Sequence, residues 1–221
     1  EHAVELSRKA QELGADALLQ VTPYYNKASQ EGLVRHFTQV ADHVSIPILL
    51  YNVPSRTGVT IQPETYRILS EHPNIRGTKE ASGNLSLIAR TAALCGQGFD
   101  IYSGNDDQTV PIMSLGGKGV VSVLANIMPK ETHKMCRLYL DGDVKESRRM
   151  QLQLLEIMEA LFWDGNPIPV KTALGLMGVC GDDLRLPLTP MEPEQRERLA
   201  EVMKRQGISL KKELHNQTNL L

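Results

Sequence analysis

One lysine occupies a setting that suits imine chemistry. Lys79 lies at the end of a predicted strand, residues 74–80, in the sequence NIRGTKE. Burial penalises the ammonium form of a lysine, and the neutral amine that burial favours can attack a carbonyl carbon to form a Schiff base. The alternative is a lysine whose aliphatic stem lies on the sheet while its amine reaches solvent. Lys79 is therefore a candidate nucleophile for carbonyl chemistry.

A tyrosine near the end of the preceding predicted strand and an arginine just beyond it could assist such a lysine. Tyr51 belongs to the apolar run IPILLYNV, residues 46–53, and Arg56 lies five residues beyond Tyr51, at the end of a turn predicted over residues 52–56. A phenol near an imine-forming lysine can pass the proton that loss of water requires, and a guanidinium suits a carboxylate. The alternatives are a tyrosine that covers the sheet edge with its ring and a surface salt bridge from Arg56, for which Glu80 is one candidate partner.

Metal and phosphate chemistry have weaker support in the sequence. The acidic pair in SGNDD, residues 103–107, could bind a cation, but a cap between a strand and a helix is the favoured interpretation. The six histidines show no metal-ligand spacing, so no metal site is predicted. The glycine-rich run LGGKGVVSV, residues 115–123, precedes a predicted strand, which favours a tight turn over a phosphate cradle.

Helices and strands alternate through the first part of the chain and must position these residues. The alternation predicts a parallel sheet, because each right-handed crossover returns the chain to the same sheet. An open doubly wound sheet and a (β/α)₈ barrel both fit. The residues with possible chemistry lie in the connections after the strands, and no G-x-G-x-x-G motif of a dinucleotide-binding fold is present. Both observations favour the barrel. The predicted strands are residues 17–22, 46–53, 74–80, 99–104 and 118–124, and the predicted helices that precede them are residues 1–13, 32–44, 63–73, 84–96 and 109–117.

The rest of the chain has a helical pattern. Helices are predicted at residues 128–140, 143–162, 168–178 and 192–206. The predicted organisation is therefore an α/β fold in three parts. These are a partial (β/α) barrel over residues 1–127, a last barrel helix with a helical extension over 128–206, and a polar tail over 207–221.

Composition narrows the class of protein. The chain has 221 residues, 41% of them hydrophobic, which is enough for a sizeable core. Its 24 Lys and Arg nearly cancel its 26 Asp and Glu, so neither nucleic acid nor a membrane surface is an expected partner. No apolar run approaches the roughly 20 residues of a membrane span, and the three widely spaced cysteines predict reduced thiols. These features predict a cytoplasmic protein.

Several motifs occur together and in order: VTPYYNKASQEGL, LLYNVPSRTG, GTKEASGN, YSGNDD, GGKGVVSV and NPIPVKTALGLMG, followed by LRLPLTP. From residue 1 to about residue 207 the chain resembles the dihydrodipicolinate synthase family of class I pyruvate-dependent aldolases. The resemblance implies a (β/α)₈ barrel with a C-terminal helical extension, assembled as a dimer or tetramer. It also implies a lyase that condenses pyruvate with L-aspartate-4-semialdehyde through a lysine Schiff base. The product is 4-hydroxy-tetrahydrodipicolinate, on the way to diaminopimelate and lysine, and no cofactor is implied.

The resemblance also assigns roles to residues in the matching motifs. Lys79 matches the Schiff-base lysine, Tyr51 the proton-relay tyrosine and Arg56 the arginine that receives the semialdehyde carboxylate. Tyr25 matches a tyrosine that enters the active site of a neighbouring subunit to complete the relay. The matched main-chain positions that line the pocket are Gly104 and Val121.

Parts of the family pattern have no match in residues 1–221. In the family a Thr-Thr pair on an early loop holds the pyruvate carboxylate, and one of its hydroxyls belongs to the proton relay. Five predicted strands leave three strand-helix units of a barrel to be expected ahead of residue 1. We therefore expect residues 1–221 alone to be loosely structured and to give no turnover. His2 stands where feedback-sensitive members have Glu, so lysine inhibition is not expected.

Two other functions stay open from the sequence. A sister aldolase for N-acetylneuraminate or a 2-keto-3-deoxy sugar acid would use the same lysine. Such enzymes, however, do not place a carboxylate-binding arginine at the position of Arg56. A truncated, inactive barrel that acts only through subunit contacts would form no imine at Lys79.

Overall fold

The computed structural model describes residues 1–211 of the chain. These residues belong to two units, Glu1–Ser122 and Val123–Leu221, which are described separately below. The division predicted after residue 127 stays a prediction. Most of the predicted polar tail, residues 212–221, lies outside the described residues.

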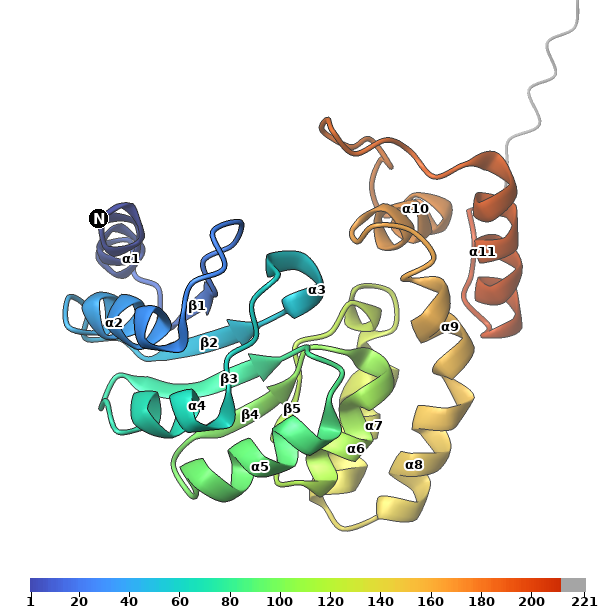
Figure 1. Cartoon of the computed structure of the whole chain (residues 1–221). Coiled ribbons are helices and arrows are strands. Elements are labelled where there is room, and N and C mark those ends of the chain that lie inside the picture. The colour runs from blue at the N-terminus through green and yellow to red at the C-terminus, as the bar shows by residue number, and fades with distance from the viewer. Residues whose placement is uncertain (212–221) are drawn as a thin grey trace, which may run out of the picture. The chain divides into compact units, whose positions relative to one another are not determined.

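The first unit contains a five-stranded sheet in which every neighbouring pair is parallel (Figure 1). The strands lie in the order of the sequence, with no reversal. A doubly wound sheet reverses its order at a switch point, whereas a (β/α)₈ barrel adds each strand beside the last. The sheet therefore has the barrel topology, as predicted. The strands are β1 (Leu18–Val21), β2 (Ile48–Asn52), β3 (Ile75–Glu80), β4 (Asp100–Ser103) and β5 (Gly119–Val120).

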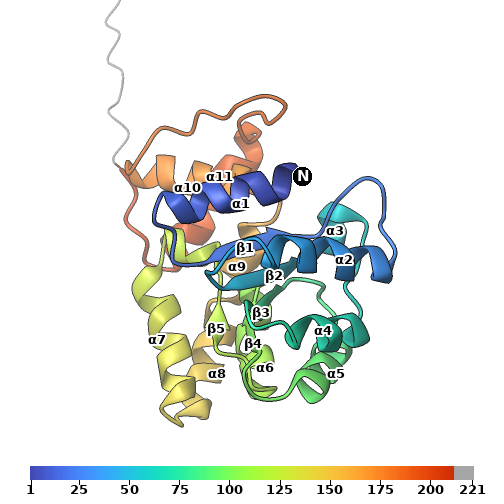
Figure 2. The ribbon, with the colours of Figure 1, turned by 90° about the vertical axis from the view of Figure 1, so that its left-hand side faces the viewer.

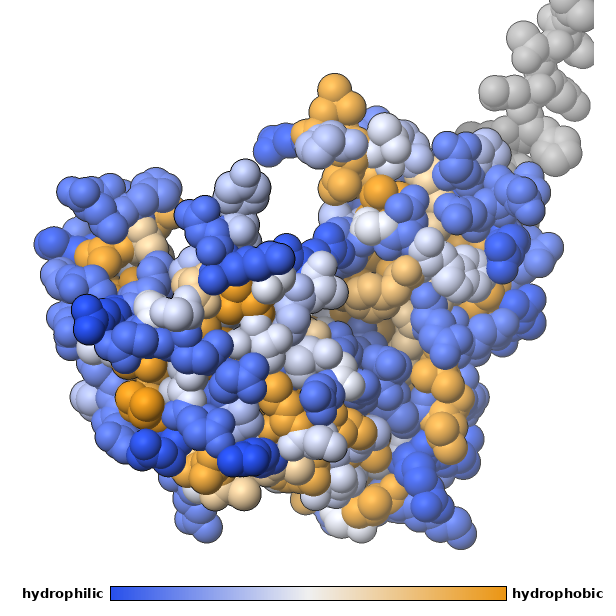
Figure 3. All heavy atoms as spheres, viewed as in Figure 1, coloured by the Kyte–Doolittle hydropathy of each residue, from blue (hydrophilic) through white to orange (hydrophobic). Residues whose placement is uncertain are grey.

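Helices cover one face of this sheet and follow one another in chain order (Figure 2). Ser29 accepts a hydrogen bond from the main chain of α2, and Asn84 does the same for α5, so each satisfies a free N–H group in the first turn. Hydrophilic side chains dominate the outer surface of the layer at the left of Figure 3. The helices are α1 (His2–Glu12), α2 (Gln30–Ala41), α4 (Pro63–Ser70), α5 (Leu85–Cys95) and α6 (Thr109–Ser114).

Side chains of successive strand residues point to opposite faces, and this alternation decides which of them meet the helices. In β2 the side chains of Ile48, Leu50 and Asn52 are buried, while those of Leu49 and Tyr51 are half-buried on the other face. The buried face packs with the helices around a core whose largest members include Phe37, Leu33, Tyr66 and Ile75. Tyr51 therefore lies on the face of the sheet opposite these helices.

Two predicted details are wrong. The strand predicted at residues 118–124 is shorter and consists of β5, Gly119–Val120, alone. The neighbouring strand β4 ends at Ser103, which pairs with Val120, so later residues have no partner on β4. Residues Leu124–Asn126 form the short 3₁₀-helix η2 instead. The segment after β2, expected to be a turn, is the short helix α3 (Pro54–Thr57). It begins at a proline and is followed by Gly58, whose φ of 71° suits a residue without a Cβ atom.

The second unit is helical. The helix predicted at 143–162 is divided into α8 (Val144–Gln153) and α9 (Leu155–Ala160) at Leu154, whose ψ of −2° departs from helical values. The buried Ser147 hydroxyl on α8 donates to the carbonyl of Met135 at 2.8 Å and so connects α8 to α7. Among residues 1–211, no helix has both the length and the apolar character needed to cross a membrane. The remaining helices are α7 (Pro129–Leu140), α10 (Ile168–Met177) and α11 (Pro193–Arg205).

Candidate active site

The sheet brings Lys79 and Tyr51 together. The two residues are Cα partners on the parallel strands β3 and β2, and their side chains share the face away from the helices. The Lys79 Nζ atom lies 4.3 Å from the centroid of the Tyr51 ring. Tyr102 on β4 is the Cα partner of Lys79 on its other side. The structure therefore places the predicted nucleophile beside the predicted proton-transfer group.

Partial burial shifts the pKa of both groups in the direction that imine formation needs. Burial lowers the pKa of Lys79, and the carboxylate of Asp106 acts against that shift. Burial raises the pKa of the Tyr51 phenol, and the positive charge of Arg56 acts against that shift. A larger share of Lys79 is thus the neutral amine, while Tyr51 keeps the proton that it would donate.

Arg56 lies in α3, on the loop side of the same strand end. Its side chain is exposed, and its charge acts on the phenol of Tyr51. The alternative salt bridge to Glu80 is wrong, because Glu80 is 1% exposed and its carboxyl group is bonded to Asn52, Tyr66 and Ser82. Arg56 therefore lies on the short helix that follows the Tyr51 strand, with its charge acting on that phenol.

Tyr25 lies apart from this pair. It belongs to the loop between β1 and α2 and has a φ of 72°, which is uncommon for a residue with a Cβ atom. Its side chain is 90% exposed, so it projects into solvent and does not pack against Lys79 or Tyr51. The structure brings Tyr51 to Lys79 and lets the charge of Arg56 act on Tyr51, but it leaves Tyr25 facing outward.

Gly104 and Val121 follow the ends of β4 and β5 at the same edge of the sheet. The Gly104 N–H donates to the carbonyl of Glu80 at 2.8 Å, and the Val121 N–H donates to the carbonyl of Ser103 at 2.8 Å. A Cβ atom at position 104 would lie only 3.2 Å from the Lys79 Cε atom. Glycine therefore leaves the space that the lysine side chain occupies.

Two acidic residues near Lys79 have surroundings that the motifs did not indicate. Asp106 was predicted only as part of a cap or a cation site, yet it is 2% exposed and its charge acts on Lys79. Glu80 is buried on the helix-covered face directly behind the lysine. Its period-two spacing from the buried Thr78, opposite in phase to Lys79, was the available sequence signal.

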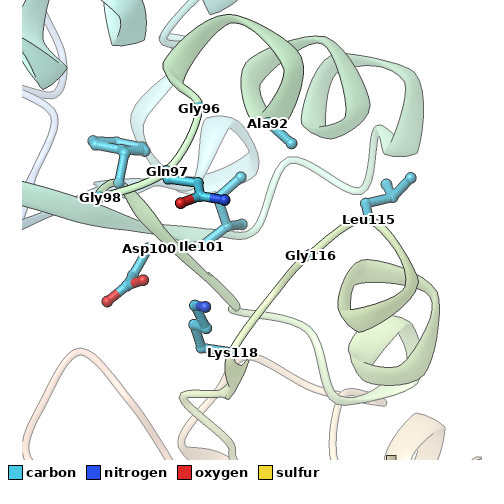
Figure 4. Close-up of a pocket in the computed structure, with 10 residues that line it drawn as sticks. Ala92, Gly96, Gln97, Gly98, Asp100, Ile101, Leu115, Gly116 and Lys118 are labelled. Carbon is cyan, nitrogen blue, oxygen red and sulfur yellow. The ribbon is translucent and has the colours of Figure 1, made fainter. Parts of the chain in front are cut away.

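The cavity drawn in Figure 4 lies at the other end of the strands. It measures about 550 Å³, and its polar lining includes Gln97, Asp100 and Lys118. These residues stand at the start of β4 and just before β5, whereas Lys79 is near the end of β3. Chemistry on parallel barrels occurs at the carboxyl ends of strands. Among residues 1–211, no three His, Cys, Asp or Glu side chains gather as metal ligands.

A partly desolvated lysine at a strand end, with a phenol against it and a guanidinium nearby, is the arrangement of a Schiff-base enzyme built on a (β/α) barrel. The family model described as "Dihydrodipicolinate synthetase family" matches residues 1–206. The chain belongs to this family. The fold class and the enzyme family predicted from the motifs are thereby confirmed.

Individual relatives agree with the family model. The 4-hydroxy-tetrahydrodipicolinate synthase of Caldicellulosiruptor bescii is 56% identical over 210 residues, which are 95% of this chain and 71% of that protein. The dihydrodipicolinate synthase structure from Thermotoga maritima is 42% identical, with a TM-score of 0.91, over 93% of this chain and 71% of that one. A chloride-inhibited dihydrodipicolinate synthase from Acinetobacter baumannii, solved with pyruvate, is 41% identical. Its TM-score is 0.91 over the same shares of the two chains.

Proposed function

We propose that this chain joins pyruvate to Lys79 as a Schiff base and condenses it with L-aspartate-4-semialdehyde to give 4-hydroxy-tetrahydrodipicolinate. The observation that carries the proposal is the half-buried Lys79 amine, held 4.3 Å from the centre of the Tyr51 ring at a strand end. The names of the relatives support the reaction, and the pyruvate complex of the Acinetobacter baumannii enzyme supports the first substrate.

The first chemical step is addition of the neutral Lys79 amine to the keto carbon of pyruvate. A C–N bond forms, the carbonyl oxygen takes up a proton, and the resulting carbinolamine loses that oxygen as water. Tyr51 supplies the proton for the departing hydroxyl, since burial raises the pKa of its phenol and keeps it protonated. The iminium then withdraws electrons from the methyl carbon, which loses a proton to the Tyr51 phenolate and attacks the aldehyde carbon of the second substrate, whose oxygen takes up that proton. The amino group of the second substrate then adds to the iminium carbon and the Lys79 amine leaves, which closes the ring and frees the enzyme.

The second substrate carries a carboxylate, and Arg56 is the group assigned to it. A guanidinium can donate two parallel hydrogen bonds to a carboxylate. Arg56 is exposed on α3 while its charge already acts on the Tyr51 phenol, so a semialdehyde bound there would approach the lysine side of the site. Gly104 and Val121 supply the main chain that lines this edge.

Borohydride trapping tests the proposal. The protein is mixed with pyruvate, the imine is reduced, and peptide mass spectrometry locates the adduct. We expect the adduct on Lys79 in the wild type and in a Lys118→Arg control, whose lysine lies at the opposite strand ends. Failure to trap pyruvate on Lys79 would contradict the proposal. Consumption of aspartate semialdehyde, rather than a sugar-acid partner, separates the reaction from that of the sister aldolases.

Trapping without turnover has a separate meaning. It leaves the role of Lys79 in imine formation supported and assigns the loss to a later step, deprotonation of the pyruvate methyl group or attack on the aldehyde. The cytoplasmic location also stays a prediction.

We further propose that the chain works as a homo-oligomer in which Tyr25 completes a neighbouring subunit's site. The 90% exposed phenol on a positive-φ loop supports this, because the residue is presented outward. Mixed subunits test it: Tyr25→Phe chains keep the lysine, and Lys79→Arg chains keep the tyrosine. Each variant alone should trap pyruvate poorly, and the mixture should regain trapping. No gain on mixing would show that Tyr25 acts within its own chain or not at all.

A further inference from the structure

A buried polar cluster lies on the helix-covered face of the sheet, behind the strand ends that carry Tyr51 and Lys79. We name it the Glu80 cluster. Asn52 and Tyr66 are 0% exposed and Glu80 is 1% exposed. Polar side chains buried this deeply need hydrogen-bond partners, because an unsatisfied one costs free energy. The cluster's members are Asn52 on β2, Tyr66 on α4, and Thr78 and Glu80 on β3.

The carboxyl group of Glu80 is the centre of the cluster. The Asn52 side-chain amide donates to both of its oxygens, each at 3.1 Å. The Tyr66 hydroxyl donates to Oε2 at 2.9 Å, and the main-chain N–H of Ser82 donates to Oε1 at 2.9 Å. One side chain therefore connects the end of β2, the helix α4 and the loop that follows β3.

These connections lie one residue from the chemistry. Asn52 follows Tyr51 on β2, and Glu80 follows Lys79 on β3. Across the two strands Tyr51 is the Cα partner of Lys79, and Asn52 is the Cα partner of Glu80. The Asn52 side-chain oxygen also accepts the N–H of Ile61 at 3.1 Å, which fixes the orientation of its amide. A shift of β3 along β2 would break the Asn52–Glu80 bonds at the same time as it moved Lys79 away from Tyr51.

We propose that Glu80 is a positioning residue that locks the ends of β2 and β3, so that the Lys79 amine is held against Tyr51. The catalytic meaning of this inference rests on the function proposed above. Catalysis depends steeply on such spacing, since a displacement of about 1 Å can cost about a hundredfold in rate.

Stability alone is a weak reason for a carboxyl group at this place. Burial raises the pKa of Glu80, and the hydrogen bonds from Ser82, Asn52 and Tyr66 only partly oppose the shift. Apolar side chains of similar volume often hold a core at least as well as buried charged groups do. An apolar side chain, however, makes no directional hydrogen bonds. The bonds of Glu80 specify one alignment of the two strands.

The geometry of the cluster indicates a conservative replacement that keeps directional hydrogen bonds between the strands. In Glu80→Gln the amide oxygen can accept from Ser82 and Asn52, while the new NH₂ group donates to the Tyr66 oxygen. Tyr66 can then donate to the Thr78 hydroxyl, 3.1 Å away, and Thr78 donates to the carbonyl of Leu50 at 3.1 Å. Glu80→Leu removes every bond to the carboxyl group, and Tyr66→Phe removes one.

The test compares rates of pyruvate trapping on Lys79 in these variants. Tyr66→Phe and Glu80→Leu should slow trapping about tenfold to a hundredfold, by the steep dependence on position. Glu80→Gln should stay close to the wild-type rate. Ser147→Ala is the matched control, because it removes another buried hydroxyl, the 2.8 Å bond to Met135 in the second unit. Its trapping rate should equal that of the wild type.

Three results would overturn the inference. One is wild-type trapping rates in Tyr66→Phe and Glu80→Leu. Another is an equal loss in Ser147→Ala at the same loss of melting temperature, which would make the effect one of stability. The last is a Glu80→Gln rate as low as that of Glu80→Leu, which would assign the effect to charge. If Glu80→Leu does not fold, Tyr66→Phe carries the comparison.

A second measurement separates this inference from the proposed function. The pH dependence of Lys79 acetylation by acetic anhydride, followed by peptide mass spectrometry, reports the pKa of its amine without pyruvate. In Tyr66→Phe that pKa should rise toward the ordinary lysine value as water reaches the amine, while in Ser147→Ala it should not change. If the wild type fails to trap pyruvate, the proposed function fails. The acetylation profile then still decides whether the Glu80 cluster holds Lys79.

Discussion

Gly104→Ala tests the geometry of the site with a single methyl group. Gly104 lies at the edge of the sheet next to the lysine, and its N–H donates to the carbonyl of Glu80 at 2.8 Å. An added Cβ atom would lie 2.7 Å from the Ala81 Cβ atom and 3.2 Å from the Lys79 Cε atom. The variant should therefore push the lysine side chain or the end of β3 out of place.

The size of the effect follows from these contacts. The 2.7 Å approach to Ala81 falls about 0.7 Å short of the 3.4 Å at which ordinary van der Waals contact begins. Ala81 has no flexible side chain that could turn aside, and the Glu80 carbonyl oxygen, 3.2 Å from the new atom, is main chain. Overpacking of this kind costs about 1–3 kcal/mol of stability. Because a shift of about 1 Å can cost a hundredfold in rate, we expect pyruvate trapping on Lys79 to slow about tenfold or more.

The assay measures the trapping rate and the unfolding midpoint together. Gly165→Ala is the control, since a Cβ atom at that exposed position meets nothing within 4 Å. The control should keep the wild-type trapping rate. A Gly104→Ala protein that is as stable as the wild type and traps pyruvate equally fast would refute the placement of Lys79 against Gly104.

The other substitutions and the pH profile test individual roles. Lys79→Arg should fold normally and trap no pyruvate, because arginine stays protonated and cannot attack a carbonyl. An undiminished yield of the adduct would contradict the assignment of Lys79 as the nucleophile. Arg56→Ala should raise the KM for aspartate semialdehyde, at a loss of about 1.5–3 kcal/mol for a charge-assisted pair, and should leave pyruvate trapping unchanged. Equal damage to pyruvate binding would count against that role. The wild-type trapping rate should rise with pH as Lys79 loses its proton and level off below 10.5, because burial lowers the pKa of the amine. A plateau only above that value would show an ordinary, solvated lysine.

Much of the fold could be predicted because it depends on local patterns. Apolar spacing located the strands and the helices, and their alternation indicated a parallel sheet. That sheet aligns consecutive strand ends, so Tyr51 and Lys79 could be expected near each other before any coordinates were known. Their observed pairing, as Cα partners on β2 and β3, follows from the register of the strands.

The misplaced details depend on partners that lie far away in the sequence. The β-branched run after Gly119 has strand propensity, but it leaves the sheet because β4 ends at Ser103 and offers no further pairing. Tyr25 follows the end of β1 and Tyr51 lies near the end of β2, yet Tyr51 is half-buried and Tyr25 is 90% exposed. Exposure of this kind depends on loop conformation, and the positive φ of Tyr25 has no clear signal in the motif.

The orientation of Glu80 follows from a local rule. Successive strand residues face opposite sides, so Glu80 cannot share a face with Lys79. If Lys79 points to the open face, Glu80 must point under the helices, where a salt bridge to the exposed Arg56 is out of reach. A carboxyl group in that position requires donors, and the residue opposite it on β2, Asn52, provides them at 3.1 Å. Alternation thus puts the reactive amine on one face and the bonds that align its strand on the other.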